Sequence, residues 1–199
     1  NVDTRIQGHL DIPLNDTGLW QARQVARALA SEPGAAVYTS DLQRAHATAQ
    51  AVARATGAPL TTHTGLRERS FGHFQGRTFA EIEAELPEDA HRWRKRDPHY
   101  APEGGESLVT LRERIERTVA QLAQQHLGEQ VVMVAHGGVL DVLYRLATRQ
   151  DIQAPRTWQL SNAAINRLLW TPDGLSLVGW ADIGHLQDDA DAPLDESTT

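Results

Sequence analysis

The sequence predicts a mixed α/β fold built on a mostly parallel sheet, and three observations support this class. Helical and strand patterns alternate over most of the 199 residues. The continuous apolar run at residues 131–135 is typical of a parallel strand that is buried on both faces. Residues 164–170 and 175–180 flank an Asp-Gly turn, which predicts a final antiparallel hairpin.

Two helices and a strand are predicted in the first third of the chain. Residues 1–15 follow neither a helical nor a strand period and are predicted to form a loop. A helix is expected over residues 17–31, followed by a strand over residues 35–38. Ser40 and Gln43 have the spacing of a capping box, so we expect a second helix to begin there and to end near Gly57.

The middle of the chain is predicted to be irregular and then to form short helices. Residues 59–77 contain three glycines and no regular period. Thr78 and Glu81 repeat the capping-box spacing and predict a short helix, and a second, charged helix is expected over residues 88–97. A loop rich in proline and glycine follows.

The strongest amphipathic helix is predicted over residues 108–122, where apolar residues recur every three or four positions. The apolar strand at residues 131–135 comes next, and a helical pattern resumes over residues 137–149. We therefore expect a single domain over residues 1–186, with a helical insertion at about 78–105. Residues 187–199 are acidic and polar and are predicted to be a disordered tail.

Composition excludes several classes of function. Hydrophobic residues make up 40% of the chain and the formal net charge is -7, so we expect neither a nucleic-acid nor a membrane partner. The absence of cysteine excludes disulfides, thiolate metal sites and cysteine nucleophiles. The nine histidines lack a metal-ligand spacing, and we predict no metal site and no cofactor.

His136 is the first candidate for chemistry, because it follows the apolar strand and precedes Gly137 and Gly138 at a helix start. Free N–H groups and the helix dipole attract phosphate at such a position, and a histidine there can donate to an anion or transfer a proton. The structural alternative is a histidine that caps its own helix beside a glycine turn.

Arg44 and Glu68 are the other two candidates. A cation in the first turn of a helix, such as Arg44, either turns to solvent or helps the helix N–H groups to hold an anion. Glu68 lies between Arg67 and Arg69. It belongs either to a surface charge cluster or to a site where its proton is needed as a phosphate ester leaves.

In combination, these segments resemble the histidine phosphatase (phosphoglycerate mutase-like) superfamily over almost the whole chain. The matching segments occur in the family's order, which makes the likeness far more specific than any one of them. They are Arg5-Ile6-Gln7-Gly8, Pro13-Leu14-Asn15-Asp16-Thr17-Gly18, Ser40-Asp41-Leu42-Gln43-Arg44-Ala45, Leu66 to Gly72 around Glu68, His136-Gly137-Gly138, and Pro102 to Ser107.

The resemblance implies a three-layer α/β/α sandwich with a central, mostly parallel sheet and an antiparallel strand at one edge. It also implies a cytoplasmic, metal-independent phosphatase that hydrolyses a small phosphorylated metabolite through a phosphohistidine intermediate. The family's Arg-His-Gly motif does not appear in the sequence, and we expect the nucleophilic histidine just upstream of Asn1.

The resemblance also implies roles for individual residues. Glu68 would protonate the leaving oxygen and later activate water, while Arg44 and His136 would surround the phosphoryl oxygens together with Arg5. The predicted substrate-binding residues are Asn1, Arg5, Gln7, Gly8 and Gly137.

Two other functions stay open at this point. The first is a cofactor-dependent phosphoglycerate mutase, which must retain the phosphoryl group and transfer it again. The insertion at residues 78–105 is short, and a more open site favours a phosphatase. The second is a non-catalytic phosphate-binding or scaffold module, which an absent nucleophile would explain. A homodimer is also left open.

Overall fold

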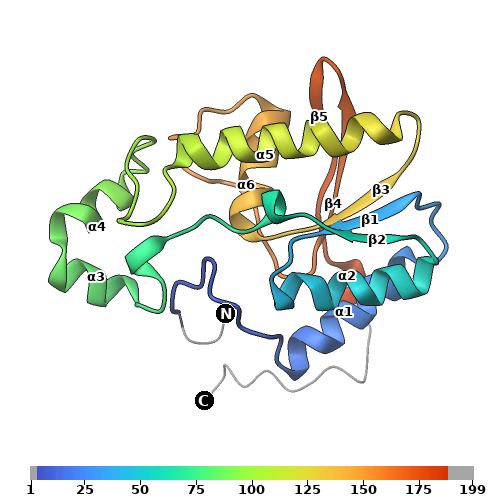
Figure 1. The fold of residues 1–199 in the computed structure, drawn as a ribbon, viewed down its shortest axis with the longest axis horizontal. Coiled ribbons are helices and arrows are strands. Elements are labelled where there is room, and N and C mark those ends of the chain that lie inside the picture. The colour runs from blue at the N-terminus through green and yellow to red at the C-terminus, as the bar shows by residue number, and fades with distance from the viewer. Residues whose placement is uncertain (1–3, 188–199) are drawn as a thin grey trace.

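The computed structural model describes residues 4–187, and its helices and strands alternate as the sequence predicts (Figure 1). Asn1 and all of the predicted tail except Gln187 lie outside the described residues. The helices are α1 (Asp16–Leu29), α2 (Gln43–Thr56), α3 (Phe79–Glu85), α4 (Pro87–Arg94), α5 (Leu108–Ala123) and α6 (Gly137–Thr148). The strands are β1 (Ala36–Thr39), β2 (Leu60–Thr62), β3 (Val131–Val134), β4 (Ile165–Thr171) and β5 (Gly174–Asp182).

Three strands form a parallel sheet in the order β2-β1-β3. In the central strand, Val37 is in register with Leu60 on one side and with Val132 on the other. Strand β2 was predicted to be irregular, because a strand of only three residues is too short to show a period. The predicted hairpin is confirmed, and β4 and β5 form a separate antiparallel sheet of two strands.

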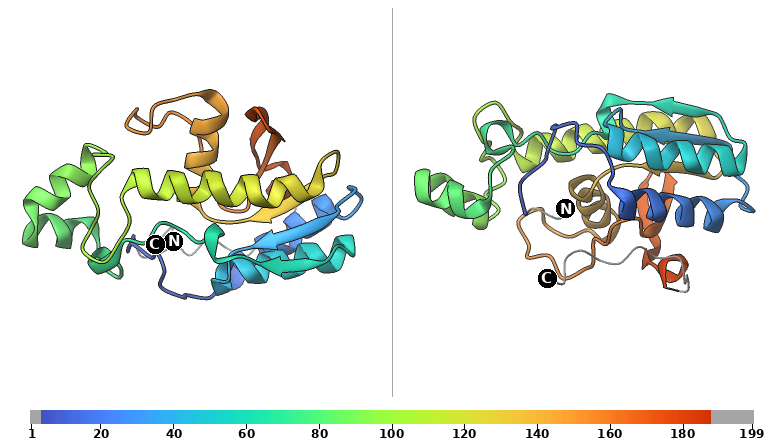
Figure 2. Two further views of the ribbon diagram at one scale, coloured as in Figure 1. Left: turned by 45° about the horizontal axis from the view of Figure 1, so that its top comes forward. Right: turned by 90° about the horizontal axis from the view of Figure 1, so that it is seen from below.

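Helices cover both faces of the parallel sheet, which confirms the predicted mixed α/β class with three layers. On one face, Val37, Val132 and Val134 belong to a core shared with α1 and α2. On the other face, Tyr38 and Met133 pack toward α5. Figures 1 and 2 show α5 on one side of the sheet and the pair α1 and α2 on the other.

Strand β3 is less buried than predicted. All four of its residues, from Val131 to Val134, are only half-buried. Among the described residues, β3 lies at one edge of the three-stranded sheet, with β1 as its hydrogen-bonded neighbour. The expectation of a strand fully buried on both faces was therefore wrong in this detail.

The capping box predicted for the first helix of the insertion is confirmed. The hydroxyl of Thr78 accepts the N–H of Glu81 at 3.2 Å, and the carboxylate of Glu81 accepts the N–H of Thr78 at 3.0 Å. The two short helices α3 and α4 enclose a small apolar cluster of their own around Phe74 and Ile82. Among the described residues, none of the helices has the length and apolar character needed to span a bilayer.

The capping box predicted at Ser40 and Gln43 is wrong. Helix α2 begins at Gln43, and its cap residue Leu42 provides no side-chain hydrogen bond. Instead, the carboxylate of Asp11, from the N-terminal loop, accepts the N–H of Gln43 at 2.7 Å. The hydroxyl of Ser40 is free for a different contact, with His136. A helix does begin at this place, as the spacing of Ser40 and Gln43 predicts, but the carboxylate of Asp11 caps it instead of Ser40.

Candidate active site

The candidate site lies where the parallel strands β1 and β3 end. Ser40 follows β1 directly, and the N–H of Ser40 donates to the carbonyl of Val134 at the end of β3. His136 is the cap residue of α6 and is almost fully buried. Its Nε2 lies 2.7 Å from the hydroxyl oxygen of Ser40, which is fully buried. Ligands of α/β proteins collect at this end of a parallel sheet.

The imidazole of His136 is neutral over the physiological pH range. Burial, and after it the charge of Arg44, lowers the pKa of His136 to about 3. The next residue, Gly137, is exposed, and a Cβ built on it would have no described atom within 4 Å. The first turn of α6 is therefore next to open space at Gly137, and the helix dipole favours an anion there.

Glu68 reaches the same helix start from the loop before the insertion. Its carboxylate accepts the N–H of Gly138 at 2.9 Å and the N–H of Arg69 at 2.7 Å. Burial raises the pKa of Glu68, and these two hydrogen bonds only partly oppose that effect. Because its pKa is raised, the carboxyl group keeps its proton up to a pH closer to neutral, as a proton donor requires.

Gly138 is necessary for this contact. A Cβ at position 138 would lie 2.2 Å from a carboxylate oxygen of Glu68, which is much closer than carbon and oxygen can approach. The glycine therefore allows the carboxylate to lie directly against the first turn of α6.

Arg44 links the N-terminal loop to both catalytic candidates. Its guanidinium donates to the carbonyls of Gly8 and Leu10, each at 2.8 Å. The positive charge of Arg44 lowers the pKa of His136 and opposes the rise in the pKa of Glu68. Arg44 has thus not turned to solvent, and the three predicted catalytic residues come together at one place.

The N-terminal loop is fixed against the loop that holds Glu68. Gly8 has a φ of +53°, and a Cβ there would lie 2.4 Å from the side-chain oxygen of Gln75. That oxygen accepts the N–H of His9 at 2.9 Å, and Nε2 of His9 lies 2.7 Å from the carbonyl of Glu68. His9 was not predicted, because no motif or period in the loop distinguishes it from its neighbours.

Arg114 is a second residue that sequence reasoning missed. From α5, its guanidinium forms an ion pair with Glu106 at 2.8 Å and donates to the carbonyls of Gly65, Arg67 and Glu68. These contacts hold the loop that carries Glu68 against α5. The amphipathic pattern of α5 indicates its apolar face only, so nothing in the sequence assigns Arg114 a role.

The structure does not bring all the predicted substrate-binding residues to this cluster. The guanidinium of Arg5 is exposed, forms an ion pair with Glu81 at 3.2 Å and donates to the carbonyl of Gly76. Gln7 is half-buried, and its carbonyl accepts the N–H of Leu10. Asn1 lies outside the described residues. Roles for these three stay predictions, and Arg5 would have to leave Glu81 to contact a phosphate.

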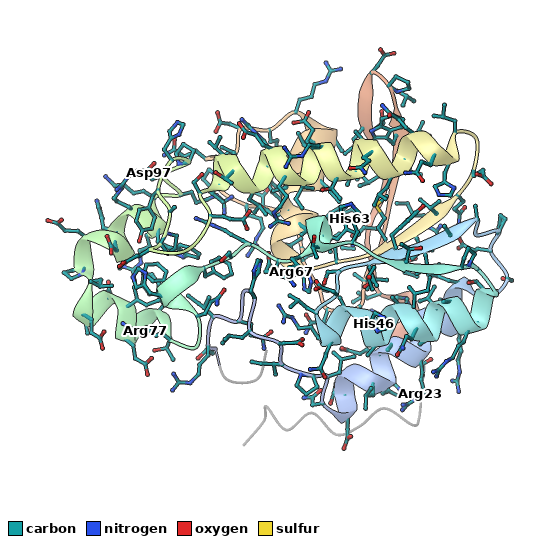
Figure 3. All side chains as sticks on the ribbon, viewed as in Figure 1. Arg23, His46, His63, Arg67, Arg77 and Asp97 are labelled. Atoms are coloured by element: carbon teal, nitrogen blue, oxygen red, sulfur yellow. The ribbon has the colours of Figure 1, made fainter. Side chains whose placement is uncertain are left out.

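Arg67 and Arg69, on either side of Glu68, have different surroundings. Arg67, labelled near the middle of Figure 3, pairs with Asp41 at 2.6 Å at the surface. Arg69 is buried, and its guanidinium lies 4.6 Å from the ring centre of Trp93. In the described part of the chain, no three His, Asp or Glu side chains group in a way that could hold a metal ion.

Comparison with known proteins identifies relatives over nearly the whole chain. A family model described as "Histidine phosphatase superfamily (branch 1)" matches residues 1–183. Phosphoglycerate mutase-like protein 4 of Arabidopsis thaliana is 36% identical over 192 residues, covering 94% of this chain and 82% of the relative. The metal-independent phosphoserine phosphatase of the same plant is 35% identical over 189 residues, covering 94% and 78%.

Solved structures have the same fold. YhfR of Bacillus stearothermophilus superposes with a TM-score of 0.86 at 27% identity, covering 94% of this chain and 93% of the other. Mycobacterial glucosyl-3-phosphoglycerate phosphatase in complex with VO3 superposes with a TM-score of 0.81 at 32% identity, covering 92% and 93%.

Proposed function

This chain belongs to the histidine phosphatase superfamily, branch 1, and we propose that it is a phosphatase that hydrolyses a small phosphomonoester. A phosphohistidine mechanism is typical of this family, and relatives of the chain are enzymes that carry phosphatase names. The observation that supports this proposal best is the contact of Glu68 with the first turn of α6, beside His136. It puts a proton donor next to a place suited to a phosphoryl group.

We assign binding of the phosphoryl group to Arg44, His136 and the N–H groups at the start of α6. Arg44 is cationic at all relevant pH values, and the α6 dipole adds a partial positive charge. A neutral His136 contributes an N–H donor without the cost of burying a further charge. Such fixed donors stabilise the charge that develops as phosphate is transferred, which is the main means of catalysis for this reaction.

We assign proton transfer to Glu68. As the expected nucleophilic histidine forms a bond to phosphorus and the bond between phosphorus and the ester oxygen breaks, the carboxyl group of Glu68 gives its proton to that oxygen, and the alcohol leaves. In the second step the carboxylate takes a proton from the water that attacks the phosphohistidine, and inorganic phosphate is released. The nucleophilic histidine expected just upstream of Asn1 stays a prediction. Sequencing the coding region upstream of Asn1 tests it.

The small size of the insertion favours a phosphatase over a mutase. Its helices α3 and α4 have seven and eight residues, so the insertion offers little cover to keep water from the phosphoenzyme. The test is to assay the protein as encoded in full on a panel of phosphomonoesters that includes 3-phosphoglycerate. A phosphatase releases inorganic phosphate, a mutase forms the 2-phospho isomer without net release, and a binding module does neither.

Two further expectations stay proposals. We propose that the enzyme acts in the cytoplasm on a soluble metabolite, and cell fractionation tests the location. A homodimer also stays a proposal, and sedimentation equilibrium tests it.

A further inference from the structure

A cavity of about 330 Å³ lies between the helical insertion and the start of α5. Its wall includes the arginines Arg69, Arg94 and Arg96 and the aromatic rings of Phe79, Trp93 and Tyr100. Asp97, labelled in Figure 3, marks its position near the first turn of α5. The volume is in the range that holds a small molecule or one end of it.

The cavity wall carries an excess of positive charge. Three arginines line it beside one carboxylate, Asp97, which is paired with Arg92 at 2.9 Å. Two of the three are themselves paired with carboxylates outside the lining, Arg94 with Glu83 at 3.0 Å and Arg96 with Asp141 at 3.2 Å. Arg69 is only 6% exposed, and burial together with the charge of Arg96 lowers its pKa to about 10. The positive charges of these two guanidinium groups repel each other, and an anion between them would stabilise both charges.

Within residues 4–187, the guanidinium groups of Arg69 and Arg96 keep donors that no hydrogen bond uses. Arg69 donates through Nε to the carbonyl of Glu106 at 2.9 Å and through Nη2 to that of Tyr100 at 3.3 Å. Arg96 likewise uses Nε and Nη2, on Ile152 and Asp141, each at 3.2 Å. Because a guanidinium has five N–H donors, both side chains can bind a further acceptor without losing these bonds. Carboxylate and phosphate groups suit this planar geometry.

Two of the lining residues also contact the segments that form the candidate active site. Arg69 follows Glu68, and its backbone N–H holds the Glu68 carboxylate while its side chain lines the cavity. Arg96 is paired with Asp141, which lies on α6 one turn after Gly137. The cavity is therefore fixed to both segments that carry the catalytic candidates.

We infer that this cavity binds a second anionic group, a carboxylate or a phosphate, on the leaving-group part of the phosphomonoester. The inference rests on the proposed phosphatase function and narrows its substrate class. It assigns Arg69 and Arg96 to substrate recognition. A separate small anion has the same chemistry, and the experiment below distinguishes the two sources.

The test compares two ligands that differ only in this group. Glycerol 3-phosphate and 3-phosphoglycerate have the same carbon skeleton, but the second carries a carboxylate in place of a hydroxymethyl group. Calorimetric titration is expected to show 3-phosphoglycerate binding about tenfold tighter, because hydrogen bonds to a charged group are stronger than those to a hydroxyl. The preference should disappear in Arg69→Met and persist in part in Arg69→Lys.

Arg77→Met is the matched control, because Arg77 is a nearby arginine that pairs with Glu85 and does not line the cavity. It should keep the wild-type preference. Equal affinity for the two ligands in the wild type, or an unchanged preference in a folded Arg69→Met, would overturn the inference. If the Arg69 variants do not fold, the exposed Arg94 gives a second test, since Arg94→Met should reduce the preference about threefold. An unchanged preference there would also overturn it.

A second titration separates the two sources of the anion. Citrate, which carries no phosphate, is titrated into protein saturated with either ligand. If the second anionic group belongs to the substrate, 3-phosphoglycerate blocks citrate and glycerol 3-phosphate does not. If neither ligand blocks citrate, the cavity binds a separate anion and the inference is wrong. These titrations are carried out in a Glu68→Gln background, in which hydrolysis of the ligands is slow, so they report binding alone. Their failure is therefore distinct from a failure of the wild-type protein to release phosphate, which would contradict the proposed function instead.

Discussion

The carboxylate of Glu68 accepts the N–H of Gly138 at 2.9 Å, which connects a loop of the first half of the chain to a helix start 70 residues later. This contact brings together the proposed proton donor and the turn proposed to bind phosphate. Neither residue could be assigned to the other from the sequence.

Gly138→Ala is expected to displace Glu68. A methyl group at this position would lie 2.2 Å from the carboxylate, so the loop must move. Turnover of an alkyl phosphate should fall about 100-fold, since a misplaced proton donor loses most of its effect. Steady-state kinetics measure this. Gly34→Ala, at a site with open space, is the control, and wild-type turnover in Gly138→Ala would contradict the geometry.

Ser40 is expected to fix the tautomer of His136. Its oxygen accepts the N–H of Leu42 at 3.3 Å, so its hydroxyl proton is available to Nε2 of His136 at 2.7 Å. The proton of the neutral ring is then on Nδ1, where it can donate to a phosphoryl oxygen. Nitrogen-15 NMR of labelled histidine, with vanadate bound, should show the Nδ1–H form in the wild type.

In Ser40→Ala both tautomers should appear, with turnover lowered about tenfold. Ser70→Ala removes a hydroxyl from the neighbouring surface loop and should change neither property. An Nε2–H signal in the wild type would show that Ser40 accepts rather than donates, and would rule out this role.

The stability of the protein should depend on His136 in mildly acid solution. The folded pKa of about 3 lies below the ordinary 6.5, so between these values the unfolded chain binds the extra proton. Stability therefore rises with pH in this range and is lost as pH falls, with a slope of up to about 1.4 kcal/mol per pH unit from this residue. Urea denaturation between pH 4 and 6.5 should give a smaller slope for His136→Asn. Equal slopes would contradict the burial of a neutral ring.

Arg114→Met is expected to lower the free energy of unfolding by about 2–4 kcal/mol, because it removes the ion-pair partner of Glu106 and a hydrogen-bond donor to three loop carbonyls. Arg67→Met removes a more exposed ion pair and should cost less than about 1 kcal/mol. Urea denaturation compares the two. A similar small loss in both variants would show that Arg114 does not support the Glu68 loop.

The sequence predicted those elements whose signal is local. The amphipathic period of α5, the Thr78 capping box and the Asp-Gly hairpin are each specified within a few residues, and all three are present. The Ser40 capping box failed because a carboxylate from a distant loop, Asp11, took its place. Local spacing does not reveal such a competitor.

In the candidate site too, residues that belong to a local motif could be predicted, and residues that act through distant contacts could not. Arg44, Glu68 and His136 were recognised from their motifs, and the structure brings them together. His9 and Arg114 act through contacts with residues far away in the sequence, which leave no pattern in the chain. Arg5 matched a motif, but its guanidinium is paired with Glu81, a partner supplied by the insertion.

The role of Glu68 as proton donor is tested most directly by the dependence of kcat/KM on the leaving group. This constant reports transfer of the phosphoryl group to the enzyme, before water enters. Glu68→Gln should lower it about 10² to 10⁴-fold for an alkyl phosphate, whose oxygen must be protonated to leave. For 4-nitrophenyl phosphate, whose leaving group needs no proton, the loss should be less than about tenfold. Equal losses for both esters would contradict the assignment of Glu68 as the acid.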